Sequence, residues 1–181
     1  MNEKSLNLRL VKPTKEYKEQ VMNYRKEFLE KGENLSGCAL LEKVKSFDEW
    51  IDFVGRLSKE YGDSYVPSTV YLAIREEDNK LVGIIDFRHE LSDFLFNYGG
   101  NIGYSVLPEE RRKGYAKKML SLMLEICRKE GLERVLITCD KNNIASAKTI
   151  MANGGTLENE IDDKNIVSKS GILQRYWIKL K

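Results

Sequence analysis

The chain has few of the residues that mark disulfide-rich, metal-binding or proline-rich proteins. Its 181 residues include only one histidine, three prolines and the three cysteines Cys38, Cys127 and Cys139. The cysteines are odd in number, far apart and without CxxC spacing, so they predict neither a disulfide framework nor a zinc site. The sequence thus argues against a small disulfide-stapled secreted fold and favours a reducing compartment.

Long apolar runs and a strong net charge are also missing. No apolar run approaches the roughly 18 residues of a membrane span, and the start MNEKSLNLRLVK has no apolar signal region. The net charge is +2, whereas binding to a nucleic-acid backbone needs a broad basic face. We therefore expect a cytoplasmic protein with no nucleic-acid partner and no membrane partner, folded as a single domain over residues 1–181.

Apolar periodicity and turn residues predict the order of the elements. Strands are expected at residues 6–11, 69–75, 81–88, 101–107, 135–138, 156–161 and 172–180. Helices are expected at residues 14–32, at 46–62 after the capping box of Ser46, at 116–131 and at 144–152. The order β-α-α-β-β-β-α-β-α-β-β predicts an α/β sheet with a right-handed parallel crossover through the 116–131 helix.

The stretch PEERRKGYAKKML, residues 108–120, is unusual in its charge. Its five cations are Arg111, Arg112, Lys113, Lys117 and Lys118. The amino end of a helix already carries partial positive charge, so each exposed cation there is disfavoured by about 0.3–1 kcal/mol. An anionic ligand is therefore expected to bind at this stretch.

Two interpretations of this stretch differ in where the helix begins. In one, Pro108 opens the helix, and Glu109 and Glu110 lie in its first turn. However, residues 109–113 include no apolar side chain to bury, and Gly114 inside the helix would cost about 1 kcal/mol relative to alanine. A helix start near Gly114 is favoured instead. Residues 111–116 are then a loop whose backbone N–H groups can bind a phosphate.

The pattern Val106-x-Pro108-x-x-Arg111-x-x-Gly114-x-Ala116 resembles the acetyl-CoA signature Gln/Arg-x-x-Gly-x-Gly/Ala of the GNAT superfamily of N-acetyltransferases. The preceding strand and Asn143-x-x-Ser146 match that family in order and spacing. The text RHELSDFLFNYGGNIGYSVLPEERRKGYA, with the ending LQRYWI, resembles a subgroup of predicted acetyltransferases. The resemblance implies an α/β GNAT fold: a mixed, mostly antiparallel central sheet with splayed parallel central strands and flanking helices.

The resemblance also implies the cosubstrate and its binding residues. In the family, backbone amides of the loop bind the CoA pyrophosphate, the strand before it pairs with the pantetheine arm, and an asparagine bonds that arm. Carried over, the residues expected to bind acetyl-CoA are Tyr104, Ser105, Val106, Arg111, Arg112, Lys113, Gly114, Tyr115, Ala116, Lys117, Asn143 and Ser146. No metal is expected.

Acetyl transfer to an amine needs a base for the ammonium and an acid for the departing thiolate. In the family the amine attacks directly in a ternary complex, so no cysteine is required as a nucleophile. The positions of the family's base and acid align with Thr138 and Ile150, which cannot serve. The candidate catalytic residues are then His89, Tyr104 and Ser146.

Several of these residues keep a structural alternative. His89 can be a satisfied, partly buried histidine, and Ser146 can cap its helix rather than bond the CoA sulfur region. Asp140 suits either a ligand site at the end of a strand or entry into the next helix. Because Glu158, Glu160 and Asp162 alternate with other residues, we expect them on one face of a strand, where they attract a cationic amine or simply face solvent.

The predicted function is an N-acetyltransferase that uses acetyl-CoA to modify a small-molecule or peptide amine, with a homodimer as an option. The long 32–46 loop and the Trp50 helix occupy the region where the family builds acceptor specificity, but their sequence names no acceptor. The alternatives are a non-catalytic acetyl-CoA-binding module or sensor, and a transferase for another acyl-CoA or for a protein amine.

Overall fold

The computed structural model describes residues 6–59, 65–164 and 167–181. Its strands are β1 (Leu8–Val11), β2 (Ser68–Arg75), β3 (Lys80–Arg88), β4 (Ile102–Val106), β5 (Arg134–Asp140), β6 (Gly155–Asp162) and β7 (Ile172–Lys179). Its α-helices are α1 (Lys18–Glu30), α2 (Phe47–Leu57), α3 (Tyr115–Lys129) and α4 (Ile144–Met151). Short helical turns are η1 (Lys15–Tyr17), η2 (Leu95–Gly99) and η3 (Pro108–Glu110). No helix within these described ranges is both long and apolar enough to cross a membrane.

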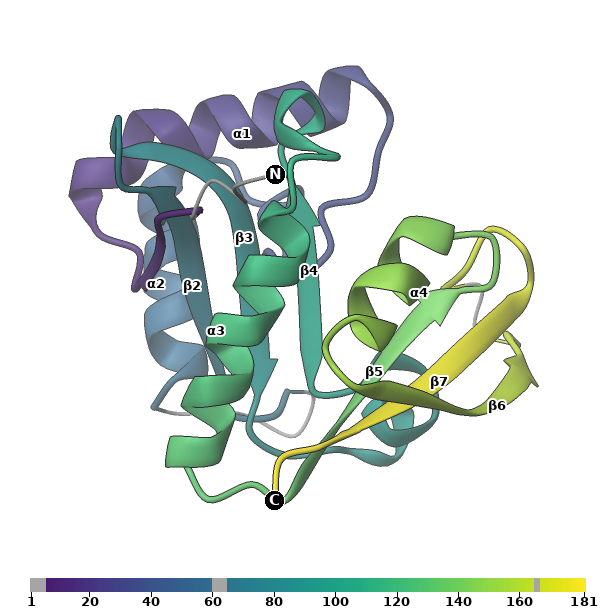
Figure 1. The fold of residues 1–181 in the computed structure, drawn as a ribbon. Coiled ribbons are helices and arrows are strands. Elements are labelled where there is room, and N and C mark those ends of the chain that lie inside the picture. Colours follow the sequence, from purple (N-terminus) through teal and green to yellow (C-terminus); the bar gives the residue numbers. More distant parts are fainter. Residues whose placement is uncertain (1–5, 60–64, 165–166) are drawn as a thin grey trace.

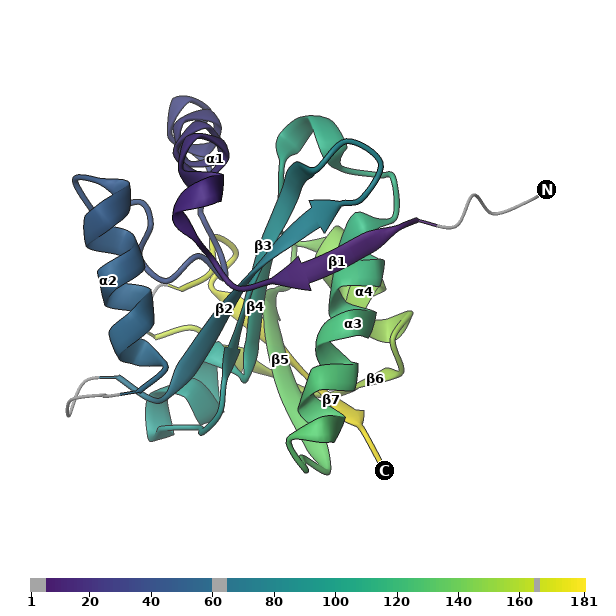
Figure 2. The same cartoon turned by 90° about the vertical axis from the view of Figure 1, so that its left-hand side faces the viewer.

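The strands form two antiparallel sheets, one ordered β1-β2-β3-β4 and the other β5-β7-β6. Helices α1 and α2 cover one face of the larger sheet, and α3 and α4 lie on the opposite side of the molecule (Figures 1 and 2). Two apolar clusters fill the space between these layers, one beneath α3 and one beneath α1 and α2. The chain is therefore a three-layer α/β structure, as the fold expectation required.

The two sheets meet at the start of β4 and separate beyond it. The Asn101 N–H donates to the Leu136 carbonyl at 2.7 Å, and the Leu136 N–H donates to Asn101 Oδ1 at 2.8 Å. A single bridge between Gly100 and Ile137 is the one strand pairing between the sheets in the described residues. Both strand arrows point toward the top of Figure 1, where β4 and β5 diverge. The edge of β4 that faces β5 is thus left without a partner strand.

The predicted order of elements is confirmed, with small changes at the ends. Helix α3 begins at Tyr115, and Pro108–Glu110 forms a separate 3-10 turn, so the interpretation with a helix start near Gly114 is confirmed. The second predicted helix ends at Leu57, and its expected end at Gly62 lies outside the described residues. Strand β5 is buried on both faces over residues 135–137, as expected.

The expectation of three carboxylates on one face of β6 is wrong. The pairing of β6 with β7 shifts between Leu157 and Asn159, so a bulge at Glu158 breaks the alternation. Glu158 pairs with Arg175 at 2.7 Å, whereas Glu160 accepts from Gln174 at 2.9 Å. Because neighbouring residues of β7 point to opposite faces, these two glutamates do so as well.

Candidate functional site

The loop between η3 and α3 presents backbone N–H groups, at residues 112–114, with no hydrogen-bond partner among the described residues. Arg112 has φ +62° and Gly114 has φ +88°, so two residues of this four-residue loop are left-handed. The first helical bond runs from the Lys118 N–H to the Gly114 carbonyl, at 3.1 Å. The N–H groups of the first turn of α3 precede that bond and have no helical acceptor.

Helix α3 differs from α2 and α4 at its amino end. Ser46 caps α2 by accepting from the Glu49 N–H at 3.2 Å, and Asn143 caps α4 by accepting from the Ser146 N–H at 3.1 Å. No side chain among the described residues caps α3. The longest helix therefore leaves its amino end, with its partial positive charge, free for an anion.

The five cations of this stretch divide into two groups. Arg111 binds both carboxylate oxygens of Glu33 and donates from Nε to the Val106 carbonyl at 3.1 Å. Lys113 binds Glu110 at 2.9 Å. The side chains of the other three cations have no ion pair within the described ranges; these are Arg112, Lys117 and Lys118. Arg111 and Lys113 therefore hold the loop in place with their side chains, and the unpaired cations supply the positive charge.

Tyr104 and Ser146 touch each other across the opening between β4 and α4. The Tyr104 hydroxyl lies 2.9 Å from Ser146 Oγ, and either oxygen can be the donor. Burial raises the pKa of Tyr104 to about 12, against a smaller lowering by the bond to Ser146. The phenol therefore keeps its proton at neutral pH, and two of the three candidate catalytic residues are brought together.

Ser105 points to the opposite face of β4, as the strand alternation predicts. The Tyr24 hydroxyl donates to Ser105 Oγ at 3.0 Å, and Cys38 Sγ lies 3.4 Å from the same oxygen. Burial raises the pKa of both Tyr24 and Cys38. These polar groups connect β4 to α1 and to the 32–46 loop, on the side away from α3.

The helix cap at α4 differs from the expectation for Ser146. The residue that caps α4 with its side chain is Asn143, so the prediction that Ser146 caps this helix is wrong. Ser146 Oγ instead meets Tyr104. Asp140 accepts from the Asn142, Lys169 and Ser170 backbone N–H groups at 2.7, 2.6 and 3.0 Å. Asp140 thus orders the entry to α4 and the end of the β6–β7 connection.

His89 lies away from the other candidates. Its Nε2 is 2.9 Å from Thr69 Oγ1, and its Nδ1 is 2.9 Å from the Glu130 carboxylate, at the carboxyl end of α3. The loop at Gly114 is at the other end of that helix, which spans 15 residues or about 22 Å. Tyr104 pairs with Ile85, four residues or about 13 Å of extended chain before His89. The structure therefore does not bring His89 to Tyr104 or to its partner Ser146, and both ring nitrogens of His89 have partners.

Thr138, Ile150 and the cysteines offer no acid, base or nucleophile. Thr138 donates to the Tyr98 carbonyl at 2.9 Å, and Ile150 is fully buried. All three thiols are buried, and burial raises the pKa of Cys139 to about 11 and that of Cys127 to about 12. A thiolate is therefore not available at neutral pH.

Sequence reasoning missed Asp86, which lies next to β4. It is 6% exposed, accepts from the Gly103 N–H at 2.9 Å and pairs with Arg88 at 3.2 Å. A lone aspartate within the apolar run of residues 81–87 was the available signal, because a buried carboxylate needs partners. Asp86 fixes the backbone of β4 one residue before Tyr104.

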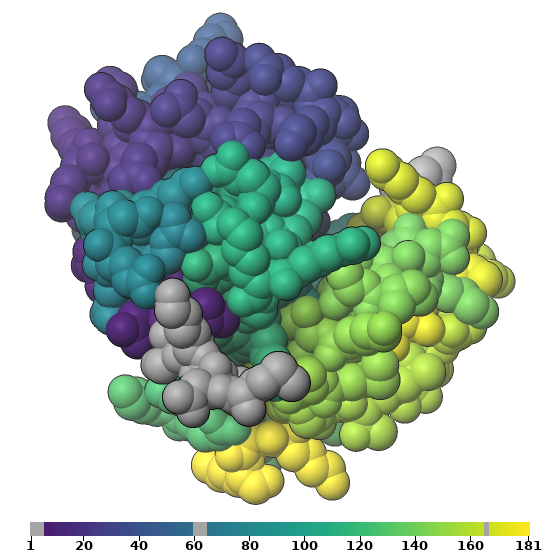
Figure 3. Space-filling view, turned by 45° about the horizontal axis from the view of Figure 1, so that its top comes forward, coloured from purple at the N-terminus to yellow at the C-terminus, as the bar shows by residue number. Residues whose placement is uncertain are grey.

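The parts of this site occupy one region of the surface. The segment from β4 to the start of α3 lies between α1 and the part of the chain after residue 140, and the surface is notched beside it (Figure 3). Backbone donors, unpaired cations and the Tyr104–Ser146 pair border the diverging strands. Such an arrangement can bind an elongated anionic ligand at the loop and hold its other end near a protonated phenol.

Comparison with known proteins is consistent with this geometry. Residues 8–156 match the family model described as an acetyltransferase (GNAT) domain. No curated protein sequence matches the chain.

Three solved structures with the same fold are named as acetyltransferases and have low sequence identity to this chain. One from Salmonella typhimurium, which modifies the N-terminal serine of ribosomal protein L7/L12, has 17% identity and a TM-score of 0.71, covering 98% of this chain and 97% of that one. An acetyltransferase of the GNAT family from Bacillus anthracis has 21% identity and a TM-score of 0.64, covering 96% and 95%. A third, from Salmonella typhimurium with its cofactor acetyl-CoA, has 15% identity and a TM-score of 0.66, covering 97% and 95%.

Proposed function

The chain belongs to the GNAT acetyltransferase family, and we propose that it transfers an acetyl group from acetyl-CoA to a primary amine by direct attack in a ternary complex. The observation that carries the donor assignment is the uncapped amino end of α3 behind a left-handed loop. Backbone N–H groups in this arrangement suit a pyrophosphate, and a helix end favours negative charge.

The residues that would hold acetyl-CoA follow from the contacts. The backbone of residues 112–117 would bind the pyrophosphate, with Arg112 and Lys117 adding charge. The open edge of β4 would pair with the pantetheine arm along residues 104–106, except at the Val106 carbonyl, which already accepts from Arg111. Asn143 uses Oδ1 to cap α4, which leaves its Nδ2 to donate to the arm.

The chemistry assigned to this chain's own residues concerns one proton. Acetyl-CoA supplies the acyl group as a thioester. In the proposed step the amine nitrogen would bond to the acyl carbon and lose its proton to solvent, while the C–S bond breaks. Tyr104 would give its phenolic proton to the departing sulfur and regain one from solvent before the next turnover, and Ser146 would hold that hydroxyl in place. Burial raises the pKa of Tyr104, so the phenol is protonated across the neutral range and its proton is present to be given.

A second candidate function is a non-catalytic acetyl-CoA-binding module or sensor. The observation in its favour is that Thr138 is engaged with the Tyr98 carbonyl and Ile150 is buried, so neither provides an acid or base. The acceptor separates the two functions, because only the enzyme needs one. Transfer from another acyl-CoA, or to a protein amine, is a variant of the first function.

Ligand binding is tested by thermal shift with acetyl-CoA, CoA, ATP and NAD. A ligand at 100 times its Kd stabilises the folded state by about 2.7 kcal/mol, which raises the Tm of a chain this size by about 5–10 °C. We expect that shift with the two CoA species only. No shift with either would overturn the donor assignment.

Catalysis is tested by release of free CoA thiol across polyamines, amino acids, aminoglycosides and peptides with free amino termini. Once an acceptor is found, Tyr104→Phe should lower kcat by about 100-fold, the lower range for a general acid, with the Kd for CoA nearly unchanged. Tight CoA binding without release on any acceptor would favour the sensor. An unchanged kcat in Tyr104→Phe would remove Tyr104 as the acid.

A further inference from the structure

Glu110 is a buried carboxylate at the entrance of the loop that precedes α3. Its side chain is 4% exposed, although it lies one residue before the exposed Arg111. Three cations surround it at hydrogen-bond distance: Arg75 Nη1 at 3.0 Å, Lys80 Nζ at 2.8 Å and Lys113 Nζ at 2.9 Å. A carboxylate buried in this way is retained only because each of its oxygens has cationic partners.

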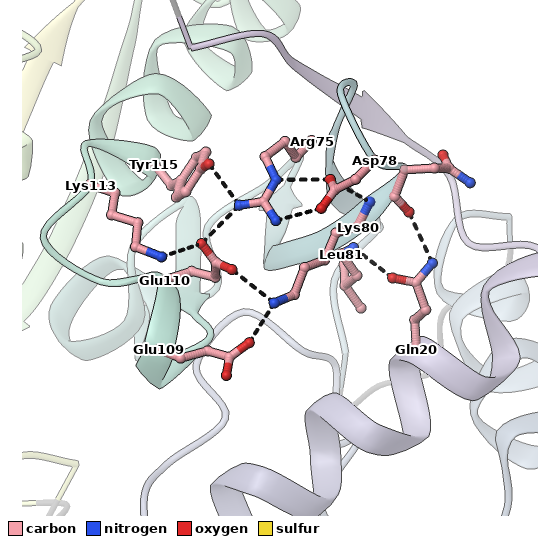
Figure 4. A network of polar contacts seen from close by, with 10 residues as sticks. Gln20, Arg75, Asp78, Lys80, Leu81, Glu109, Glu110, Lys113 and Tyr115 are labelled. Carbon is pink, nitrogen blue, oxygen red and sulfur yellow. Dashed lines mark hydrogen bonds and ion pairs between the residues drawn. The ribbon is translucent and has the colours of Figure 1, made fainter. Parts of the chain in front are cut away.

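These contacts hold the loop from both ends (Figure 4). Glu110 lies just before the loop, and Tyr115 is the first residue of α3 just after it. Arg75, at the end of β2, donates to Glu110 Oε2 at 3.0 Å and to the Tyr115 hydroxyl at 3.1 Å, both from Nη1. One guanidinium nitrogen thus connects both sides of the four-residue loop to the β2–β3 hairpin.

Contacts within the hairpin support this cluster. Arg75 also binds Asp78 through two hydrogen bonds, at 2.8 and 2.7 Å. Lys80 begins β3 and contacts both Glu109 and Glu110. Arg75 and Lys80 pair with each other at the turn end of β2 and β3, the two middle strands of the larger sheet, so the loop is attached to this hairpin.

We propose that Glu110 is a positioning residue for acetyl-CoA, which holds residues 111–114 in the conformation that aims the α3 amide groups at the pyrophosphate. The inference rests on the proposed function, because it assumes that this loop binds CoA. Glu110 does not touch the ligand in this assignment. It acts through Lys113 and through Arg75, which it shares with Tyr115.

Electrostatics alone predicts that loss of the Glu110 charge strengthens CoA binding, whereas the proposal predicts that it weakens CoA binding. The direction of the change in Kd therefore tests the proposal. Removing a negative charge next to a phosphate site, and releasing Lys113 to face the ligand, would strengthen CoA binding if the loop kept its shape. If Glu110 holds the loop, its loss weakens binding instead, because part of the binding free energy is then used to order the loop.

The experiment compares Glu110→Gln with Glu109→Gln by calorimetric titration of CoA. The control removes the same charge one residue earlier; within the described part of the chain the Glu109 carboxylate pairs only with Lys80, and its side chain is more than half exposed. We expect the Kd of Glu110→Gln for CoA to rise about tenfold, equivalent to about 1.4 kcal/mol. The Kd of Glu109→Gln should stay within about twofold of the wild-type value. An equal or tighter Kd in Glu110→Gln would overturn the proposal.

A second readout separates positioning from general damage to the fold. With acetyl-pantetheine, which has no pyrophosphate, kcat/KM should be the same in Glu110→Gln and the wild type, while with acetyl-CoA it should fall about tenfold, equivalent to about 1.4 kcal/mol. An equal loss with both donors would show a structural role only and reject the proposal.

If Glu110→Gln does not fold, Tyr115→Phe removes only the hydroxyl that Arg75 binds. It should raise the Kd for CoA about threefold, equivalent to about 0.65 kcal/mol, and an unchanged Kd would reject the proposal. Absence of CoA binding by the wild type would instead reject the proposed function itself.

Discussion

Gly37 provides the sharpest test of how the 32–46 loop is seated on β4. It has φ +75°, and a Cβ built on it would lie 2.2 Å from the Gly103 carbonyl oxygen and 2.7 Å from the Tyr104 nitrogen. Both obstacles are backbone atoms of β4, so no side-chain rotation relieves the overlap. Gly37→Ala must therefore move either the loop or the strand that carries Tyr104 and Ser105.

Gly32→Ala is the matched control, because Gly32 has φ +62° and nothing lies within 4 Å of its Cβ position. The left-handed conformation costs an alanine about 1–2 kcal/mol at either position. Overlap with packed atoms adds about 1–3 kcal/mol at Gly37 alone. We therefore expect urea unfolding to show Gly37→Ala less stable than Gly32→Ala by about 1–3 kcal/mol, at a similar m-value.

Equal destabilisation by the two variants would refute this reasoning, because it would mean that the loop does not lie on β4 as described. The functional consequence is separate. If the loop contributes to acceptor binding, as the family resemblance implies, Gly37→Ala should raise the KM for the acceptor more than the Kd for CoA. Gly32→Ala should change neither.

Two further predictions concern charge. Arg112→Ala and Lys117→Ala should each weaken CoA binding a few-fold and lower its salt dependence, whereas Arg111→Ala should mainly lower the Tm, because Arg111 binds Glu33 and the Val106 carbonyl. Calorimetry measures the Kd for CoA and thermal unfolding measures the Tm. If Arg111→Ala mainly weakened CoA binding while the other two variants mainly lowered the Tm, the assignment of Arg111 to loop structure and of Arg112 and Lys117 to ligand binding would be wrong. Burial raises the pKa of Glu110, but bonds to Lys80 and Lys113 outweigh it and lower that pKa to about 2. The resulting stabilisation, up to about 3 kcal/mol, is present above the unfolded pKa and lost as pH falls from about 4.5 to 2. The free energy of unfolding of Glu110→Gln should therefore fall less steeply with decreasing pH over that range. A slope equal to that of the wild type would contradict the assignment of this stabilisation to the ion pairs of Glu110.

Local patterns in the sequence were enough to predict the order of the helices and strands, whereas the family resemblance supplied the expected arrangement of the sheet. The apolar stripe of α3, the glycines at loops and the strand alternation are each determined within a few residues. The start of α3 at Tyr115 followed from the lack of any apolar residue in 109–113. The opposite directions of Tyr104 and Ser105 followed from the two-residue period of a strand.

The errors arose where a partner lies far away in the sequence or where the regular period is interrupted. A single inserted residue at Glu158 reverses which face each later side chain occupies, and a pattern of alternation contains no sign of it. His89 looked suitable by its chemistry alone. Its distance from the loop depends on the length of α3 and on the direction of β3, which only the assembled fold fixes.

The five cations of the 108–120 stretch also have partners that the sequence alone does not reveal. From the sequence, all five cations were expected to bind the same anionic ligand. In the structure, Arg111 meets Glu33, which lies 78 residues earlier, and Lys113 meets the buried Glu110. These two cations stabilise the conformation of the loop, and the positive charge available to a ligand comes from Arg112, Lys117 and Lys118.

The loop therefore combines two electrostatic tasks that oppose each other. A phosphate site benefits from every cation, yet a loop with two left-handed residues needs some of those cations paired to keep its conformation. Placing the pairing carboxylate, Glu110, in a buried position beside the β2–β3 hairpin satisfies the second task and keeps the carboxylate itself off the exposed surface of the proposed CoA site. This division would explain why the proposed polyanion site contains an ionised glutamate, and it is the reason that the sign of the Glu110→Gln effect on CoA binding is informative.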